Sequence, residues 1–518
     1  MRLAEVVATS AVVAATRSRL AKVAALADLL GRARDGGEDE LTTVVSYLGG
    51  ALRQRRTGLG WRGVADLPEP ADEPTLTMLE VHAAFEALAA EQGPGSQARR
   101  ASAVADLFGR ADAAEQRWLR GLVTGELRQG ALDTLVQDAA AKVAGLPPAD
   151  VRRAAMLAGS TVTAGVTALT GGAEALARFV LTVGRPVLPM LASSAGDVTE
   201  AVTRLGGPVA VDTKLDGIRI QVHRNGSEVV VTTRTLDDVT ARLPEVVAVV
   251  RSLPAETLVL DGEALALDEQ GRPRAFQDTA SRTAQSHGAT ITPFFFDCLH
   301  ADGTDLLDAP LRERLEVLDR LVPERHRAPR LVTDDPVAAE EFAAGVLRAG
   351  HEGVVVKDLA AGYAAGRRGA AWIKVKPVHT LDLVVLAVEW GSGRRRGKLS
   401  NLHLGARDDR PGAPAPFVML GKTFKGLTDE LLAWQTERFL ALRTHQEGHV
   451  VHVRPEQVVE IALDGLQRST RYPGGVALRF ARVLRYRDDK TADEADALGD
   501  VLRLGATPEG PEDTPPGD

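Results

Sequence analysis

The spacing of apolar residues divides the chain into three regions of different character. Up to about residue 180, long Ala-, Leu- and Val-rich segments separated by glycine or proline predict helices throughout. Pro186 and Pro189 cannot continue a helix, so the first boundary is placed near them. From about 194 to 380 short alternating runs mix with helices, and after Pro377 the runs become strand-like. The pattern therefore predicts an all-α region, an α+β region and a small β-barrel.

The first thirty residues faintly imitate a signal peptide, but their apolar run is interrupted by Glu5, Thr9 and Ser10. Apolar residues then continue at helical spacing through Leu20 to Leu30, which predicts one amphipathic helix of a cytoplasmic protein. No stretch is long and apolar enough to span a bilayer, so no membrane partner is expected.

Four runs in the last third alternate as strands do, and they predict a barrel of the OB-fold type. They are 381–390, 399–407, 417–422 and 457–463. Between the first two lies a flexible basic loop, 391–398, whose charge suits a phosphate backbone. Residues 506–518 are rich in Pro, Gly and acidic residues, which predicts a disordered acidic tail.

Charge and cysteine content exclude little. The net charge is −8, but ten acidic and only two basic residues lie after position 487, so the preceding body is neutral. The net charge therefore excludes neither a basic nor an acidic surface patch on this body. The single cysteine, Cys298, excludes a disulfide framework and a Cys-based zinc site, and its apolar surroundings predict a buried thiol.

A lysine with an acid, a glycine and an arginine after it lies between two apolar runs, at Lys214-Leu215-Asp216-Gly217. The alternation over 218–223 predicts a half-buried strand, and 224–226 predicts a hairpin turn. Lys214 is thus predicted in a loop just before a strand, beside a glycine that permits close approach to the backbone. Taken alone, this motif is more often a solvated surface lysine.

Further polar residues follow on predicted strands or at their ends. Glu263 interrupts an apolar strand, Phe296 belongs to an aromatic run, and Glu352 precedes a buried strand. Alternation places Lys374 and Lys376 on one strand face. Each of these residues alone is more often structural than catalytic, but all of them in this order after Lys214 are improbable by chance.

In that order the motifs resemble those of the covalent nucleotidyltransferases, the superfamily of DNA ligases, RNA ligases and mRNA capping enzymes. Lys214 with Asp216 and Gly217 is similar to the nucleophile motif, and the segments around Glu263, Phe296, Glu352 and Lys374 are similar to the later ones. The run 479–490 resembles the C-terminal motif of ATP-dependent DNA ligases. Nearly the whole chain resembles the actinobacterial B-type ligases of this kind. The resemblance implies a helical DNA-binding domain at 1–190, a nucleotidyltransferase domain at 191–380, an OB-fold domain at 381–505 and the acidic tail at 506–518.

The resemblance implies a role for each matching residue. The catalytic residues would be Lys214 and Asp216, and the metal ligands Glu263 and Glu352. The pyrophosphate and DNA contacts would come from Arg482, Arg485 and Lys490. The ATP-binding residues would be Asp212 (where the family commonly has glutamate), Arg219, Arg234, Glu263, Phe296, Arg368, Lys374 and Lys376.

In the helical region, a glycine-rich turn leads into a helix at Ser96, which is a good N-cap residue, with Arg99 in the first turn. Free amides at such a helix start can hold a DNA phosphate, and Arg128 lies in a second turn of this kind. The alternative interpretation is a plain capped helix with a solvated basic face. On the motif alone this alternative is favoured.

Attack of a lysine on the α-phosphate of ATP needs an unprotonated amine. An ordinary lysine of pKa about 10.4 is neutral in only about one molecule in a thousand near pH 7.4. Lys374 and Lys376 are the predicted sources of the positive charge that helps to remove this proton. Triphosphate also calls for a hard cation with oxygen ligands, so ATP and Mg²⁺ are the predicted cofactors.

The expected partner is nicked double-stranded DNA, and the protein is expected to be a monomer. It would seal the nicks in replication, repair or recombination, in the cytoplasm and associated with the nucleoid. Two alternatives stay open. One is an RNA ligase or a capping guanylyltransferase, the latter distinguished by an adduct with GTP. The other is a catalytically silent nick-binding protein.

Overall fold

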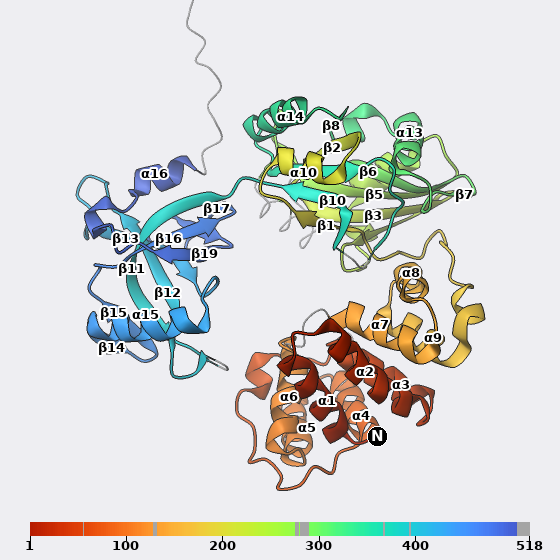
Figure 1. Ribbon diagram of the computed structural model, residues 1–518, viewed down its shortest axis with the longest axis horizontal. Helices are drawn as coiled ribbons and strands as arrows, with labels where there is room; N and C mark the ends of the chain where they lie inside the picture. Colours follow the sequence, from red (N-terminus) through yellow and green to blue (C-terminus); the bar gives the residue numbers. More distant parts are fainter. Residues whose placement is uncertain are drawn as a thin grey trace, which may run out of the picture.

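The computed structural model describes residues 1–54, 56–127, 132–274, 279, 290–365, 368–392 and 395–504. Helices come first along the chain, then a region of two sheets with helices, then a β-barrel (Figure 1). The predicted fold class is therefore confirmed. Within the described ranges no helix is long and apolar enough to cross a membrane.

The helical region is built around one core to which its first seven helices contribute, including fully buried Tyr47, Phe85 and Phe108. The predicted single N-terminal helix is wrong, because Ser18 is extended and its side chain accepts a hydrogen bond from the amide of Ala21, which starts a second helix. The helices are α1 Leu3–Ala15, α2 Arg19–Arg34, α3 Glu38–Leu48, α4 Met78–Ala90, α5 Ser96–Gly109, α6 Ala113–Thr124, α7 Leu132–Ala144, α8 Pro148–Ala158 and α9 Thr161–Leu176, with a 3₁₀ turn η1 at Trp61–Val64.

The central region contains two five-stranded sheets. The first has the order β1-β10-β9-β2-β8, and α10 and α14 pack on it through an apolar cluster that includes Val202, Val211 and Val356. Its elements are β1 Leu191–Ser194, α10 Val198–Leu205, β2 Val209–Lys214, β8 Arg330–Thr333, α14 Pro336–Arg348, β9 Gly353–Asp358 and β10 Arg368–Val375.

The second sheet has the order β4-β3-β5-β6-β7, and α11 and α13 cover one face of it. Its elements are β3 Ile218–Asn225, β4 Glu228–Thr233, η2 Thr240–Arg242, α11 Pro244–Arg251, β5 Thr257–Ala266, β6 Ile291–Ala301, β7 Thr304–Asp305, α13 Leu311–Leu321 and η3 Glu324–His326. The two sheets are joined directly where β2 ends and β3 begins, so residues 214–218 lie at their junction.

The C-terminal region is a seven-stranded sheet. Five of its strands have the order β13-β12-β11-β15-β14, and of the other two, β16 pairs with β11 and β19 pairs with β16. A separate two-stranded hairpin, β17-β18, follows β16. The elements are β11 His379–Trp390, β12 Leu399–Arg407, β13 Phe417–Thr423, α15 Asp429–Ala441, β14 Arg443–Glu447, β15 Val450–Val453, β16 Val458–Leu463, β17 Gly465–Arg468, β18 Val476–Arg479, β19 Arg482–Tyr486, η5 Ala492–Glu494 and α16 Leu498–Arg503.

The segment that joins the helical and central regions packs into the central core. Met156 on α8, Leu181 and Val187 share an apolar cluster with Val259 and Leu299 of the second sheet. On the surface, the Arg153 guanidinium forms two hydrogen bonds of 2.6 and 2.7 Å to the Asp308 carboxylate. The first and second regions are therefore packed together and not merely linked by a chain.

Candidate active site

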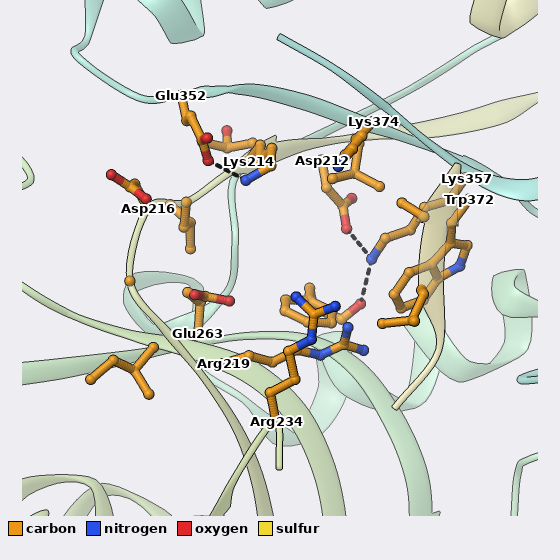
Figure 2. Close-up of a pocket in the computed structure, with 18 of the residues that line it drawn as sticks. Asp212, Lys214, Asp216, Arg219, Arg234, Glu263, Glu352, Lys357, Trp372 and Lys374 are labelled. Carbon is orange, nitrogen blue, oxygen red and sulfur yellow. Dashed lines mark hydrogen bonds and ion pairs between the residues drawn. The ribbon is translucent and has the colours of Figure 1, made fainter. Parts of the chain in front are cut away.

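A cavity of about 520 Å³ lies between the two central sheets, and strands of both contribute to its wall. Figure 2 shows Lys214, Asp216 and Glu352 on one side of it and Lys357 and Trp372 on the other. Nine predicted site residues line the cavity: Asp212, Lys214, Asp216, Arg219, Arg234, Glu263, Phe296, Glu352 and Lys374.

Lys214 is the last residue of β2, so its predicted place in a loop is wrong. The reason is pairing: β2 lies between β8 and β9 in the sheet, and Lys214 is still in register with Gly353. Gly217 follows at the close approach that the sequence suggested, because a Cβ there would lie 2.4 Å from the carbonyl oxygen of Ala264. The amine is thus carried on a strand end and aimed into the cavity.

The Lys214 amine forms an ion pair with the Glu352 carboxylate. The other oxygen of Glu352 accepts a 3.0 Å hydrogen bond from the amine of Lys376. Burial alone would raise the pKa of Glu352, but the two lysines hold that pKa below its ordinary value. The nearest group to the Lys214 amine is therefore a carboxylate, and Lys376 reaches it only through that carboxylate.

Glu263 lies deep in the cavity on β5, and burial raises its pKa to about 8, against the opposing effects of Lys214 and Arg219. The protein groups around Glu263 do not fully compensate the negative charge of its carboxylate. A bound cation would supply the missing positive charge. Glu263 and Glu352 both offer hard oxygen atoms to the same cavity, which is the donor chemistry that Mg²⁺ prefers. The residues present therefore fit a magnesium ion.

Asp212 and Lys357 form a buried ion pair that sequence reasoning did not find. The Lys357 amine is 2.5 Å from Oδ2 of Asp212, and both side chains are nearly inaccessible. Burial raises the pKa of Asp212, with Lys357 opposing it. Oδ1 of Asp212 has no hydrogen-bond partner among the described residues, although it is buried beside the cavity.

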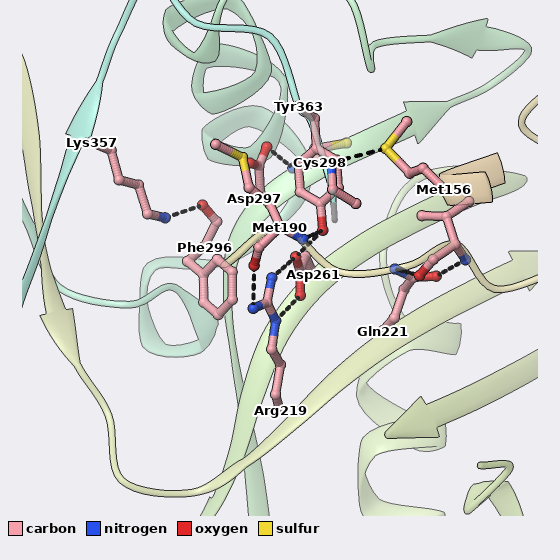
Figure 3. A network of polar contacts seen from close by, with 12 residues as sticks. Met156, Met190, Arg219, Gln221, Asp261, Phe296, Asp297, Cys298, Lys357 and Tyr363 are labelled. Atoms are coloured by element: carbon pink, nitrogen blue, oxygen red, sulfur yellow. Dashed lines mark hydrogen bonds and ion pairs between the residues drawn. The ribbon is translucent and has the colours of Figure 1, made fainter. Parts of the chain in front are cut away.

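Two aromatic rings complete this side of the cavity. The Lys357 amine lies 4.4 Å from the ring centroids of both Phe296 and Trp372. It also donates a hydrogen bond of 3.3 Å to the carbonyl oxygen of Phe296 (Figure 3). The two rings meet edge to face at 5.9 Å. Lys357 is thus fixed by a carboxylate, a carbonyl and two ring faces at once.

A hydrogen-bonded network holds Arg219 in place (Figure 3). Its guanidinium donates to both oxygens of Asp261, at 3.0 and 2.7 Å, and to the carbonyl oxygen of Met190 at 2.6 Å. The Tyr363 hydroxyl donates to Asp261 at 2.7 Å and accepts from the amide of Met190. Because three N–H groups of the Arg219 guanidinium have fixed partners, the side chain enters the cavity in one orientation.

The barrel contacts the cavity through its β17-β18 hairpin and the residue before it. Arg479, at the end of β18, donates a 2.9 Å hydrogen bond to Asp216. Asp464, just before β17, forms an ion pair with Lys376. Asp464 was not singled out in the sequence, and Arg479 appeared only as the first residue of the run 479–490. Neither contact was predicted, because the partners are 263 and 88 positions apart.

The remaining predicted residues lie elsewhere. On the barrel, Arg485 pairs with Glu460, Lys490 with Asp382, and Arg482 is 4.0 Å from Asp464. None of these three lines the cavity. Arg128 and the tail 506–518 lie outside the described residues, and of Arg368 only the backbone, in β10, is described.

In the helical region, Ser96 is not an N-cap as predicted. Gly95 takes that place in the left-handed conformation, with φ of 77°, and Ser96 is the first helical residue. Arg99 donates to the Glu91 carboxylate at 2.7 Å and to the carbonyl oxygens of Gln92 and Pro94. Its guanidinium therefore braces the glycine-rich turn in this structure.

Comparison with known proteins assigns the chain to a family. The family described as "ATP dependent DNA ligase domain" matches residues 189–376. "DNA ligase N terminus" matches 65–141, and "ATP dependent DNA ligase C terminal region" matches 395–490. Within these ranges fall the cavity and the barrel hairpin that contacts it.

Relatives of similar length support the same family. The chain is 70% identical over 502 residues to a protein of Nocardioides sp. named "Probable DNA ligase", covering 96% of this chain and 98% of that protein. It is also 70% identical over 505 residues to a "Probable DNA ligase" of Kineococcus radiotolerans, covering 97% and 100%. The solved structure "Pmar-Lig_PreS3" shares the fold, with a TM-score of 0.61 at 19% identity, over 93% of this chain and 99% of that one. This protein therefore belongs to the ATP-dependent DNA ligases, enzymes that form phosphodiester bonds.

Proposed function

We propose that the protein seals nicks with a 5′-phosphate and a 3′-hydroxyl in duplex DNA, with Lys214 as the residue that carries AMP. The observation that carries this proposal is the position of the Lys214 amine at a strand end inside the cavity, beside the carboxylates of Glu352 and Glu263. Membership of the ligase family fits the same assignment.

The Asp212–Lys357 pair is proposed to recognise adenine. The free Oδ1 of Asp212 would accept a hydrogen bond from the exocyclic amino group, and the Lys357 amine would donate to the ring nitrogen N1. Guanine presents an acceptor and a donor in the reverse order at these positions, so it would leave both buried groups unsatisfied. Phe296 would stack on the base, while Arg219, Arg234, Lys374 and Lys376 would contact the ribose and the phosphates.

The reaction consists of three phosphoryl transfers. First, the deprotonated Lys214 amine attacks the α-phosphorus of ATP, a P–N bond forms, and pyrophosphate leaves. Second, an oxygen of the DNA 5′-phosphate attacks the same phosphorus, breaks the P–N bond and returns the amine. Third, the 3′-hydroxyl loses its proton and attacks the DNA 5′-phosphorus, so that a phosphodiester bond forms and AMP leaves.

Glu263 and Glu352 are proposed to hold Mg²⁺. A bound magnesium ion would offset the negative charge of the triphosphate and of the oxygen that leaves. In this structure Glu352 pairs with both Lys214 and Lys376, so its carboxylate would have to leave the Lys214 amine in order to hold the ion. The Lys214 amine would then no longer be held in that ion pair.

The barrel is proposed to move between steps. Asp216, the residue expected to position the 3′-hydroxyl, is bound to Arg479 in this structure, so it must be released before the third transfer. Movement of the barrel would also bring Arg482, Arg485 and Lys490 toward the leaving pyrophosphate. Residues 1–190 and the barrel, 381–505, would together hold the duplex by its phosphate backbone around the nick.

The test is an incubation with α-labelled ATP and Mg²⁺, followed by addition of nicked DNA. Wild-type protein should acquire one covalent AMP, transfer it and seal the nick, whereas GTP should label it poorly. Lys214→Ala should acquire no label and seal nothing, yet bind nicked duplex. Lys142→Ala, at an exposed lysine on α7 outside the cavity, is the matched control for adduct formation and should acquire AMP as wild type does. Sealing by Lys214→Ala would refute the assignment.

A further inference from the structure

Two histidines face each other on the β14-β15 hairpin, an edge of the barrel. His445 and His452 are cross-strand partners in the antiparallel register. Their rings stack with centroids 4.4 Å apart and an angle of only 4° between planes. The pairing of the two strands therefore presents two imidazoles side by side on one sheet face.

A carboxylate completes the cluster. Glu447 lies two residues after His445, and its oxygens are 3.6 Å from Nε2 of His445 and 3.9 Å from Nε2 of His452. One ligand atom from each of the three residues lies within 4.8 Å of the others. In a tetrahedral site with metal–nitrogen bonds of about 2.0–2.1 Å, ligand atoms are roughly 3.3–3.5 Å apart. To bind one ion, these solvent-accessible side chains would have to rotate out of the stacked arrangement, so that both Nε2 lone pairs point to the same place.

The hydrogen bonds of Thr444 determine which nitrogen of His445 is available. The Thr444 hydroxyl donates its one proton to the carbonyl oxygen of His452 at 3.2 Å. Its contact of 3.2 Å with Nδ1 of His445 must then be one in which Nδ1–H donates to Oγ1. In the neutral ring this leaves a lone pair on Nε2, the atom that faces Glu447. Fixing of one ring nitrogen by such a bond is typical of metal-ligating histidines.

We propose that His445, Glu447 and His452 bind a divalent transition-metal ion such as Zn²⁺, with water completing the coordination. Two imidazole nitrogens and one carboxylate suit zinc, cobalt or nickel, and they do not suit Mg²⁺, which prefers oxygen ligands. In this tautomer the Nε2 lone pair lies beside a carboxylate, an arrangement that a bound cation would stabilise.

The three residues of the proposed metal site do not line the cavity that is proposed to bind ATP. In the seven-stranded sheet β14 is the edge strand, it pairs with β15, and all five of its residues are exposed. The contacts of the barrel with the cavity run instead through Asp464 and Arg479, on the β17-β18 side (Figure 1). The ion would therefore tie the edge strand to β15 and leave adduct formation unchanged.

The experiment uses the full chain without a polyhistidine tag. Co²⁺ is titrated and followed by its visible absorption, and Zn²⁺ affinity is measured by competition with a chromophoric chelator. The variants are His445→Ala, His452→Ala and Glu447→Gln, with His449→Ala as matched control. His449 is an exposed histidine in the turn of the same hairpin and lies outside the cluster. Circular dichroism and labelling with ATP verify that each variant is folded.

Wild type and His449→Ala should each bind one Co²⁺ or Zn²⁺ per chain, and the two histidine variants should bind at least about tenfold more weakly. Glu447→Gln should also weaken binding while it preserves the hairpin. Equal affinity in all variants, or no stoichiometric binding to wild type at about 100 μM Zn²⁺, would overturn the proposal and leave an imidazole–carboxylate ion pair as the explanation.

Discussion

The contacts of Lys357 depend on strand pairing and not on the sequence around it. In the sequence it ends the apolar run 354–356 and resembles a charge that closes a buried strand. In the structure β9 pairs with β2, which brings Lys357 diagonally opposite Asp212 in a site that excludes water. Strand pairing determines this contact, and pairing cannot be inferred from the local pattern. Glu263 and Glu352, by contrast, were predicted because they interrupt or begin apolar strands.

Replacement of Lys357 with methionine should leave the Asp212 carboxylate buried without a partner. Removing one member of a buried ion pair typically costs about 3–5 kcal/mol, so the central region should unfold at a markedly lower temperature. Adduct formation with ATP should fall as well. Differential scanning calorimetry, with ATP added to identify the transition of this region, measures the change.

The double variant Asp212→Asn/Lys357→Met should lose less stability than Lys357→Met, because no unpaired charge remains. Lys422→Met is the control, since its partner Glu389 is shared with other donors and Lys422 is a quarter exposed. If Lys357→Met and the double variant were equally unstable, charge burial would not be the cause.

The pKa of Glu263 makes stability depend on pH. Its value of about 8 in the folded protein exceeds the ordinary value of 4.5. Between these values the folded chain keeps a proton that the unfolded chain has lost. The contribution of Glu263 to the free energy of unfolding is therefore full below about pH 4.5 and is lost as the pH rises to about 8.

Without ATP and Mg²⁺, Glu263→Gln should remove this decline. Its melting temperature relative to wild type should rise by several degrees between pH 5 and pH 9, in scanning calorimetry. Glu313→Gln, at an exposed position on α13, should show no such change. Parallel melting curves for Glu263→Gln and wild type across this range would contradict the argument.

At the scale of elements, local signals located most of the strands. The predicted runs 399–407 and 417–422 correspond to β12 and to all but the last residue of β13, because alternation and turn residues define them. The break between α1 and α2 was missed, since apolar residues on both sides continue at helical spacing while Ser18 starts a new helix. The β17-β18 contact with the cavity was also missed, because it joins segments distant in sequence.

The contacts of that hairpin should hold the barrel against the central region. Replacing both Asp464 with Asn and Arg479 with Gln removes the ion pairs to Lys376 and Asp216. The linker at residues 376–378 should then be cut several-fold faster by a protease in limited proteolysis. Glu460→Gln is the matched control, because it breaks a pair inside the barrel. Unchanged cleavage of the double variant would show that other contacts hold the barrel.

For the whole molecule, net charge gave no indication of a DNA partner, since −8 is the sum of a neutral body and acidic residues near the C-terminus. The order of the three regions was predictable from composition and periodicity. Their mutual packing was not, because it rests on contacts such as Met156 with Val259, which no local pattern reveals.

Binding of nicked duplex should depend steeply on salt. If about six phosphates are contacted, affinity should fall about 10³-fold between 50 and 200 mM monovalent salt, because counterions are released from DNA. Adduct formation should change much less, since the charges of the cavity are largely buried. Fluorescence anisotropy and labelling with ATP measure the two effects. Equal losses in both assays would contradict a division between backbone binding and nucleotide chemistry.

The connection from β10 to β11 consists of three residues, 376–378, of which the first is Lys376. Pro377 restricts the φ angle of this connection, so a reorientation of the barrel must be absorbed largely by its neighbours. Lys376, at the start of this connection, is thus also one of the two lysines that pair with Glu352. A movement of the barrel that displaces Lys376 therefore also changes the charge around the Lys214 amine. The orientation of the barrel and the reactivity of the nucleophile are coupled in this enzyme.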